Sequence, residues 1–199
     1  MTDMINKNAD DRLVEKTVAS REIYDGVVLH VFCDDVLLPN KKQSIREYAK
    51  HNGAVCVVPI TEKNEVLCVK QYRYAHKKVL LEIPAGKLDS PDEDHLSAAL
   101  RELREETGAI PERIDYLGAM IPSPALIGET IYMYMARGLT IGETDFDEDE
   151  FLEIVKIPLC DMVDMVMRGE IEDGKTQAAI LKAHMILEQE RHNDQRIGS

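Results

Sequence analysis

The chain has 199 residues, of which 44% are hydrophobic, and this is enough for one domain with a proper core and a short extra arm. Its formal net charge of −13 argues against general nucleic-acid binding, which needs a basic face. We expect no membrane partner, because the sequence shows neither a secretory leader nor an apolar run long enough to cross a bilayer. The four cysteines form no C-x-x-C pair, which favours buried free thiols and a cytoplasmic location.

The beginning of the chain predicts a small β-unit. A polar start precedes two predicted strands, at 15–22 and 26–39, and the second of them ends at a Pro-Asn turn. We expect residues 1–43 to form this unit, separate from the main core, as a candidate dimerisation arm. Residues 44–51 are polar and predict a connector, with which the main domain of residues 44–199 begins.

The main domain mixes strands and helices without a strict βαβ rhythm. This mixture predicts an α+β fold in which a mixed β-sheet lies between helices. The predicted strands are 53–60, 65–72, 79–83, 114–121, 129–137 and 151–157, and the predicted helices are 90–108, 158–169 and 175–191.

The first of these helices carries start and stop signals. Ser90 is the expected N-cap, Pro91 suits the first turn, and Glu93 has the position of a capping-box acid. Gly108 is placed to end the helix in a left-handed conformation. The expected buried stripe, at helical spacing, consists of Leu96, Ala99, Leu100 and Leu103.

Three acids share the other side of this helix. Glu102 and Glu106 are four residues apart and therefore stack, with Glu105 beside them. Like charges at this spacing repel by roughly 0.2–0.5 kcal/mol per pair, and the helix dipole also disfavours acids near a C-terminus. A hard divalent cation such as Mg²⁺ reverses this argument, because it prefers oxygen ligands. The alternative is a solvated face on which Arg101 and Arg104 pair with the acids.

The stretch from residue 86 to 109 resembles the Nudix box, G-x5-E-x7-R-E-U-x-E-E-x-G-U, in which U is apolar. One departure is a sixth residue between Gly86 and Glu93, so that Asp92 stands at the box spacing. The matching residues are Gly86, Glu93, Arg101, Glu102, Leu103, Glu105, Glu106, Gly108 and Ala109.

The resemblance continues outside the box and is closest to the ADP-ribose pyrophosphatase branch of the Nudix hydrolase family. Residues 71–73 (QYR) and 81–86 (LEIPAG) are similar to that branch, as is the DGKT stretch at 173–176. Pro124, sixteen residues after Gly108, stands where the branch has its marker proline. The resemblance implies a Nudix fold and a homodimer.

The resemblance also implies a role for individual residues. The implied metal ligands are Glu102, Glu105, Glu106 and the backbone carbonyl of Ala85. The implied substrate contacts are Arg46, Arg73, Glu82 and Glu129. The implied catalytic carboxylates are Glu105 and Glu106, together with Glu150 as the base acting on water and Glu148 as the alternative base.

The activity implied by this resemblance is Mg²⁺-dependent hydrolysis of ADP-ribose to AMP and ribose 5-phosphate, with Mn²⁺ as a possible substitute ion. One alternative is hydrolysis of other nucleoside diphosphate sugars. A second alternative is a nucleotide-sugar sensor without catalysis, although a pure binder has no need of all three helix acids.

Overall fold

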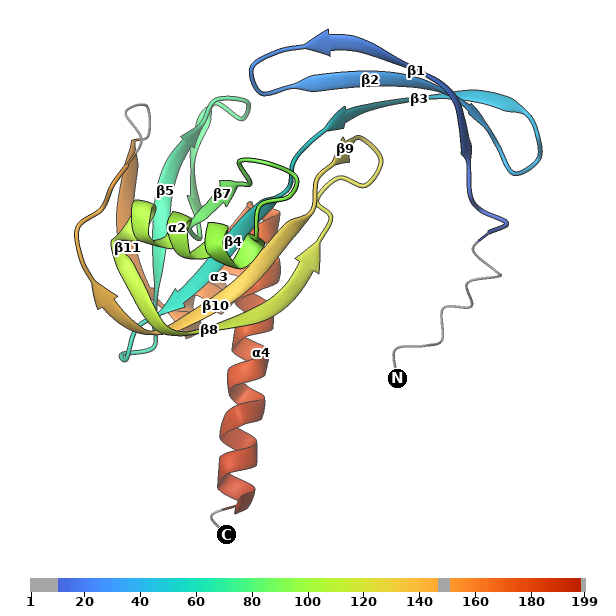
Figure 1. Ribbon diagram of the computed structural model, residues 1–199. Coiled ribbons are helices and arrows are strands. Elements are labelled where there is room, and N and C mark those ends of the chain that lie inside the picture. The colour runs from blue at the N-terminus through green and yellow to red at the C-terminus, as the bar shows by residue number, and fades with distance from the viewer. Residues whose placement is uncertain (1–10, 147–150, 198–199) are drawn as a thin grey trace. The chain divides into compact units, whose positions relative to one another are not determined.

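The computed structural model describes residues 11–146 and 151–197. Backbone contacts divide the chain into two units, of which the first extends to His51 and adds Ser123–Glu129. Each unit is built on its own β-sheet (Figure 1). In chain order, the elements are β1 (Lys16–Asp25), β2 (His30–Leu37), β3 (Gln43–Lys50), β4 (Ala54–Ile60), β5 (Glu65–Arg73), β6 (Lys78–Glu82), β7 (Ala85–Lys87), α2 (His95–Thr107), β8 (Ala109–Met120), β9 (Ile127–Gly128), β10 (Ile131–Ile141), β11 (Leu152–Pro158), α3 (Leu159–Met167) and α4 (Gly174–Ile197).

The first unit is a four-stranded sheet with the order β1-β2-β3-β9. The predicted connector at 44–51 is wrong, because this segment lies in β3 and pairs with β2 in antiparallel register from Gln43 to Lys50. Ala49 is the one buried residue of β3, so the strand lacks the apolar alternation by which a half-buried strand is recognised. The predicted domain boundary between residues 43 and 44 stays a prediction.

The second unit has a seven-stranded mixed sheet. Its main path is β11-β5-β4-β10-β8, with β6 paired to β5 and β7 paired to β4. The central pair, β4 and β10, is parallel, whereas the other pairs are antiparallel. Helix α2 covers one face, and α3 and α4 cover the other (Figure 1). The prediction of an α+β fold with a mixed sheet between helices is confirmed.

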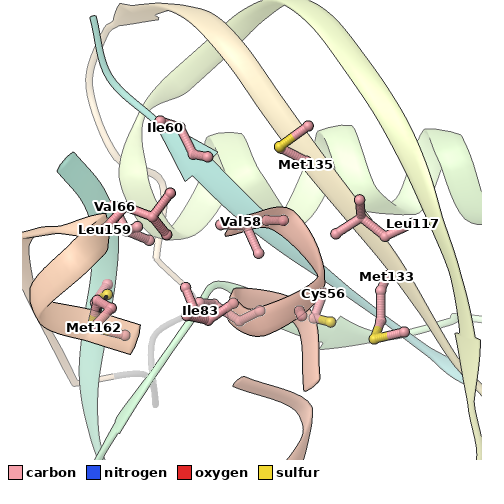
Figure 2. Packing of buried hydrophobic residues seen from close by; sticks show 14 of the residues in the cluster. Cys56, Val58, Ile60, Val66, Ile83, Leu117, Met133, Met135, Leu159 and Met162 are labelled. Atoms are coloured by element: carbon pink, nitrogen blue, oxygen red, sulfur yellow. Dashed lines mark hydrogen bonds between the residues drawn. The ribbon is translucent and has the colours of Figure 1, made fainter. Parts of the chain in front are cut away.

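The sheet is buried on both faces, and β4 shows this residue by residue. Val55 and Val57 pack with α2, while Cys56, Val58 and Ile60 join the cluster under α3 and α4. Figure 2 shows that second cluster, in which residues from β4, β5, β8 and β10 meet the side chains of α3. Fully buried side chains on both faces explain why β4 is a continuous apolar run.

One member of this cluster, Ile83, lies directly before the turn that leads into the Nudix-like segment. Its side chain is completely buried. The next residue also has a fixed place, because the carbonyl of Pro84 accepts a hydrogen bond of 2.9 Å from Val57 N–H in β4. The turn is therefore held by the core at its beginning.

Helix α2 begins four residues later than the sequence predicts. The N-cap is Asp94, whose carboxylate accepts hydrogen bonds from the Ser97 backbone N–H (2.9 Å) and hydroxyl (2.8 Å). Ser90 instead forms a turn, in which its carbonyl accepts from Glu93 N–H at 3.2 Å. Glu93 itself accepts from Asp89 N–H, so the predicted capping box is wrong. Both sites offer the same capping chemistry, and only the docking of the helix decides between them.

The buried stripe of α2 also differs from the prediction. Leu103 and Ala99 are completely buried as expected, but Leu96 and Leu100 are each 38% exposed, and Ala98 is buried instead. The two adjacent alanines, and not the two leucines, therefore face the sheet together with Leu103. Gly108 ends the helix with φ = 69°, as predicted.

No helix within residues 11–146 and 151–197 is long and apolar enough to cross a membrane. The prediction of buried free thiols is confirmed for Cys33, Cys56 and Cys68. Burial raises the pKa of Cys56 and of Cys68 to about 12. Cys160, however, is exposed, because it lies on the outer side of the first turn of α3.

Candidate active site

The acids of α2 lie against the short strand β7. The backbone N–H of Ala85 donates a hydrogen bond of 3.0 Å to Glu106 Oε2, and Glu106 is only 3% exposed. The carboxylate of Glu102 lies on Gly86, where an added Cβ would come within 1.9 Å of Glu102 Cδ. The carboxylate of Glu102 thus occupies the space that a side chain at position 86 would fill, and it would have to shift if one were added.

Arg101 neutralises part of this acidic surface. Its Nη1 donates to Glu102 Oε1 at 2.7 Å and to Glu105 Oε2 at 3.2 Å, while Nη2 lies 3.3 Å from Glu93 Oε1. Burial alone would lower the pKa of Arg101, but the charge and hydrogen bond of Glu102 outweigh burial and raise it. The acids thus have an ionic partner on the protein itself, as the alternative of a paired helix face requires.

The donor set fits a hard divalent cation. Glu106 and Glu102 both reach strand β7, at the N–H of Ala85 and at Gly86, and carboxylate oxygens are ligands that Mg²⁺ prefers. Mg²⁺ is usually held by one or two carboxylates together with substrate phosphates rather than by a complete protein cage. Among the described residues, no three His, Cys, Asp or Glu side chains form a metal centre by themselves. The candidate bases Glu148 and Glu150 lie outside the described residues.

Arg73 and Glu82 form a bidentate ion pair between the neighbouring strands β5 and β6. Arg73 Nε donates to Glu82 Oε1 at 2.6 Å, and Nη2 donates to Oε2 at 2.7 Å. The Arg73 side chain is 39% exposed, whereas that of Glu82 is 2% exposed. The hydrogen bond with Glu82 raises the pKa of Arg73, and the nearby charge of Glu106 adds to the effect. Arg73 therefore lies within electrostatic range of the α2 acids.

A third charge completes this cluster. Lys175, in the first turn of α4, donates to Glu82 Oε2 and lies 3.1 Å from Asp173 Oδ2. Burial would raise the pKa of Glu82, but the hydrogen bond from Arg73 and the charge of Lys175 outweigh it and lower the pKa. Both oxygens of Glu82 are thus engaged by cations of the protein. Its direct contact with substrate stays a prediction.

The DGKT segment, residues 173–176, resembles the family in sequence, but the sequence assigned no structural or functional role to its individual residues. Asp173 caps α4, since its carboxylate accepts from Thr176 N–H at 2.9 Å. The Thr176 hydroxyl accepts from Ile83 N–H at 3.0 Å and so ties α4 to the residue that follows Glu82. Asp and Thr at capping distance, with a Lys between them, were the signal available in the sequence.

The other two predicted substrate contacts, Arg46 and Glu129, belong to the first unit. Arg46, on β3, pairs with Glu15 and donates a hydrogen bond of 2.8 Å to the carbonyl of Ile45. Glu129 Oε1 lies 3.7 Å from His51 Nδ1. Their roles as substrate contacts stay predictions. The second unit holds the other predicted site side chains that the structure describes: Arg73, Glu82, Glu102, Glu105 and Glu106.

Known proteins share both the sequence pattern and the fold. Residues 50–179 match the NUDIX domain. The chain is 39% identical over 170 residues to the ADP-ribose pyrophosphatase of Bacillus subtilis (strain 168), covering 84% of this chain and 91% of that protein. It is 40% identical over 168 residues to the methanol dehydrogenase activator of Bacillus methanolicus, covering 83% and 90%.

A solved structure described as an ADP compounds hydrolase has the same fold. It superposes with a TM-score of 0.79 at 21% sequence identity, covering 89% of this chain and 97% of that one.

Proposed function

The chain belongs to the NUDIX domain family, and from this membership we propose that it hydrolyses the diphosphate of ADP-ribose to AMP and ribose 5-phosphate with Mg²⁺. The chain is a Nudix hydrolase. One observation carries the choice of substrate: its similarity to an ADP-ribose pyrophosphatase extends across most of both chains. The α2 acids support a site for a metal-bound diphosphate, because Glu102 lies on Gly86 of β7 and the charge of Glu106 acts on Arg73.

We assign the metal ligands to Glu102, Glu106 and the backbone carbonyl of Ala85, with Glu105 beside them. When bound, Mg²⁺ would neutralise the diphosphate oxygens and lower the pKa of a water molecule. Glu106 is oriented by the N–H of Ala85, and Glu102 is oriented by Arg101. Arg73 would hold a phosphate or sugar oxygen of the substrate, because a guanidinium presents donors in a fixed geometry. Mn²⁺ would satisfy the same oxygen donors.

In the proposed reaction, a water oxygen forms a bond to one phosphorus atom of the diphosphate. The bond from that phosphorus to the bridging oxygen breaks, and the second phosphate leaves with the bridging oxygen. Glu150 would take the proton of the water, with Glu148 as the alternative base. Arg46 and Glu129 would contribute further substrate contacts.

Two alternatives remain to be tested against this proposal. One is a different nucleoside diphosphate sugar as the substrate. The other is a sensor that binds without catalysis, and the similarity to a protein named as a dehydrogenase activator makes this a useful comparison. Against the sensor stands the buried Glu106, because a binding module gains nothing from an acid held next to two others.

The substrate assignment is tested with ADP-ribose, ADP-glucose, GDP-mannose and a nucleoside triphosphate, each with Mg²⁺ or Mn²⁺. We expect kcat/KM to be at least about tenfold higher for ADP-ribose than for the others, with AMP and ribose 5-phosphate as the products. Chelation by EDTA is expected to abolish turnover, and added Mg²⁺ to restore it. Equal turnover of GDP-mannose would contradict the assignment of ADP-ribose as the preferred substrate. Tight binding of ADP-ribose without any product would favour the sensor.

We further propose a homodimer that forms through the first unit. All ten residues of β1 are exposed, among them Val18, Ile23 and Tyr24, and β1 is an edge strand. An exposed apolar edge strand favours association with another chain. Light scattering at micromolar concentration is expected to give about twice the chain mass of 22.5 kDa. A mass near one chain would refute the dimer, whatever the substrate proves to be.

A further inference from the structure

The DGKT turn connects Arg73 to a part of the chain far from the helix acids. Lys175 is 93 residues from Glu82 in sequence, yet its Nζ donates to Glu82 Oε2. Its side chain is 12% exposed, so the pair is shielded from water on most sides. Glu82 in turn accepts hydrogen bonds from Nε and Nη2 of Arg73. Within the described part of the chain, the third guanidinium nitrogen, Nη1, donates no hydrogen bond, and it is thus available to an anion.

The geometry of the turn fixes the position of Lys175. The Thr176 hydroxyl accepts the backbone N–H of Ile83 and donates to Asp173 Oδ2 at 2.5 Å. Thr176 is completely buried, and so is Ile83. The backbone on either side of the Lys175–Glu82 contact is therefore held by separate hydrogen bonds, and the two side chains meet without needing to order a flexible loop.

Lys175 supplies one of the two positive charges around Glu82. Arg73 carries the other, while Glu82 and Asp173 carry two negative charges and Glu106 adds a third that acts on Arg73. Without Lys175, two carboxylates would face one guanidinium. Because Glu82 is 1% exposed, solvent screens this imbalance poorly. An anionic group approaching Arg73 would then meet a more negative field than in the wild type.

We propose that Lys175 is a positioning residue for anion binding at Arg73: it holds the buried carboxylate of Glu82 in the orientation that grips Arg73, and it balances that carboxylate's charge. The proposal rests on the proposed function, since Arg73 is the substrate contact there. Lys175 acts through Glu82 and does not touch the substrate. Its loss should therefore weaken binding of the ground state and the transition state alike, which raises KM with little change in kcat.

The test compares Lys175→Met, Lys175→Arg and a stability control, Arg137→Met. Arg137, on β10, ties the C-terminal half of α4 to the sheet through Glu190 (2.6 Å), and it also pairs with Asp115 on β8 (2.6 Å). For hydrolysis of ADP-ribose with Mg²⁺, we expect Lys175→Met to raise KM about tenfold or more while kcat changes less than about threefold. Lys175→Arg keeps the positive charge and should raise KM by less than Lys175→Met does. Arg137→Met should lower the melting temperature without changing KM.

A second readout does not depend on turnover. The ¹⁵N–¹H NMR signal of the Arg73 Nε–H group can be assigned by its loss in Arg73→Lys. It reports the hydrogen bond that this group donates to Glu82. We expect this signal to shift and to exchange faster with water in Lys175→Met, and to stay at the wild-type position in Lys175→Arg and Arg137→Met.

The outcomes separate the two proposals. If the wild type does not hydrolyse ADP-ribose but the Nε–H signal changes as expected, the proposed function fails and the positioning role stands. If the signal and KM are unchanged in Lys175→Met, or if Arg137→Met raises KM equally, the positioning role is overturned. A Lys175→Met protein that does not fold is replaced by Lys175→Gln, to which the same criteria apply.

Discussion

Replacement of Glu106 by glutamine is expected to lower kcat for ADP-ribose by about 10²- to 10³-fold, the usual size of effect when one group that stabilises transition-state charge is lost. Glu106 is 3% exposed and is held by the N–H of Ala85. Glutamine keeps an oxygen that can accept this hydrogen bond, so the local fold should persist. It removes the negative charge, however, and with it the attraction for a divalent cation. Steady-state kinetics at saturating Mg²⁺ measure the effect.

The matched control for this experiment is Glu188→Gln. Glu188 also lies on a helix and pairs with an arginine, Arg191, at 2.7 Å, but on the exposed side of α4. An exposed ion pair contributes little to stability, so this variant should turn over ADP-ribose as the wild type does. Undiminished kcat in Glu106→Gln, with a normal melting temperature, would show that the α2 acids do not form the catalytic site.

The second large effect is expected for Gly86→Ala. The added Cβ would lie 1.9 Å from Glu102 Cδ, far inside van der Waals contact, so the carboxylate has to move away. We expect kcat/KM to fall by about ten- to a hundredfold, as is usual when a metal ligand loses its orientation. The Mg²⁺ concentration for half-maximal activity should rise as well. A titration of activity against Mg²⁺ measures both effects.

Gly142→Ala is the control for the added methyl group. A Cβ at Gly142 would lie 3.5 Å from the carbonyl oxygen of Gly108, which is an ordinary contact. This variant should keep the wild-type Mg²⁺ dependence. If Gly86→Ala also keeps the wild-type Mg²⁺ dependence, then Glu102 can move away from Gly86 without consequence. The assignment of Glu102 as a metal ligand would then be wrong.

Local patterns in the sequence predicted most elements of the second unit. The apolar run of β4 and the alternation of β10 are properties of neighbouring residues and do not depend on the rest of the chain. The capping residue of α2 was predicted wrongly because both Ser90 and Asp94 can cap a helix, and the choice depends on how the helix meets the sheet. β3 was predicted as a connector because a strand with little burial shows no apolar period.

In the candidate site, too, some features follow from local sequence patterns and others only from the tertiary structure. The acids of α2 follow from helical spacing alone, since residues four apart stack on one face wherever the helix lies. The need for glycine at position 86 follows from the box pattern, but its reason, the carboxylate of Glu102 in the place of a side chain, is visible only in three dimensions. The pairing of Arg73 with Glu82, nine residues away, likewise depends on β5 and β6 lying in register.

By itself, the sequence determined that this protein is a Nudix hydrolase with stacked acids on one helix, because that information is carried by residues close together in the chain. The tertiary structure decided which charges surround Arg73. Glu82 and Lys175 meet only because α4 docks its first turn on the backbone of Ile83. A contact across 93 residues leaves no periodic signal, since its geometry is set by packing of the core and not by the spacing of neighbours.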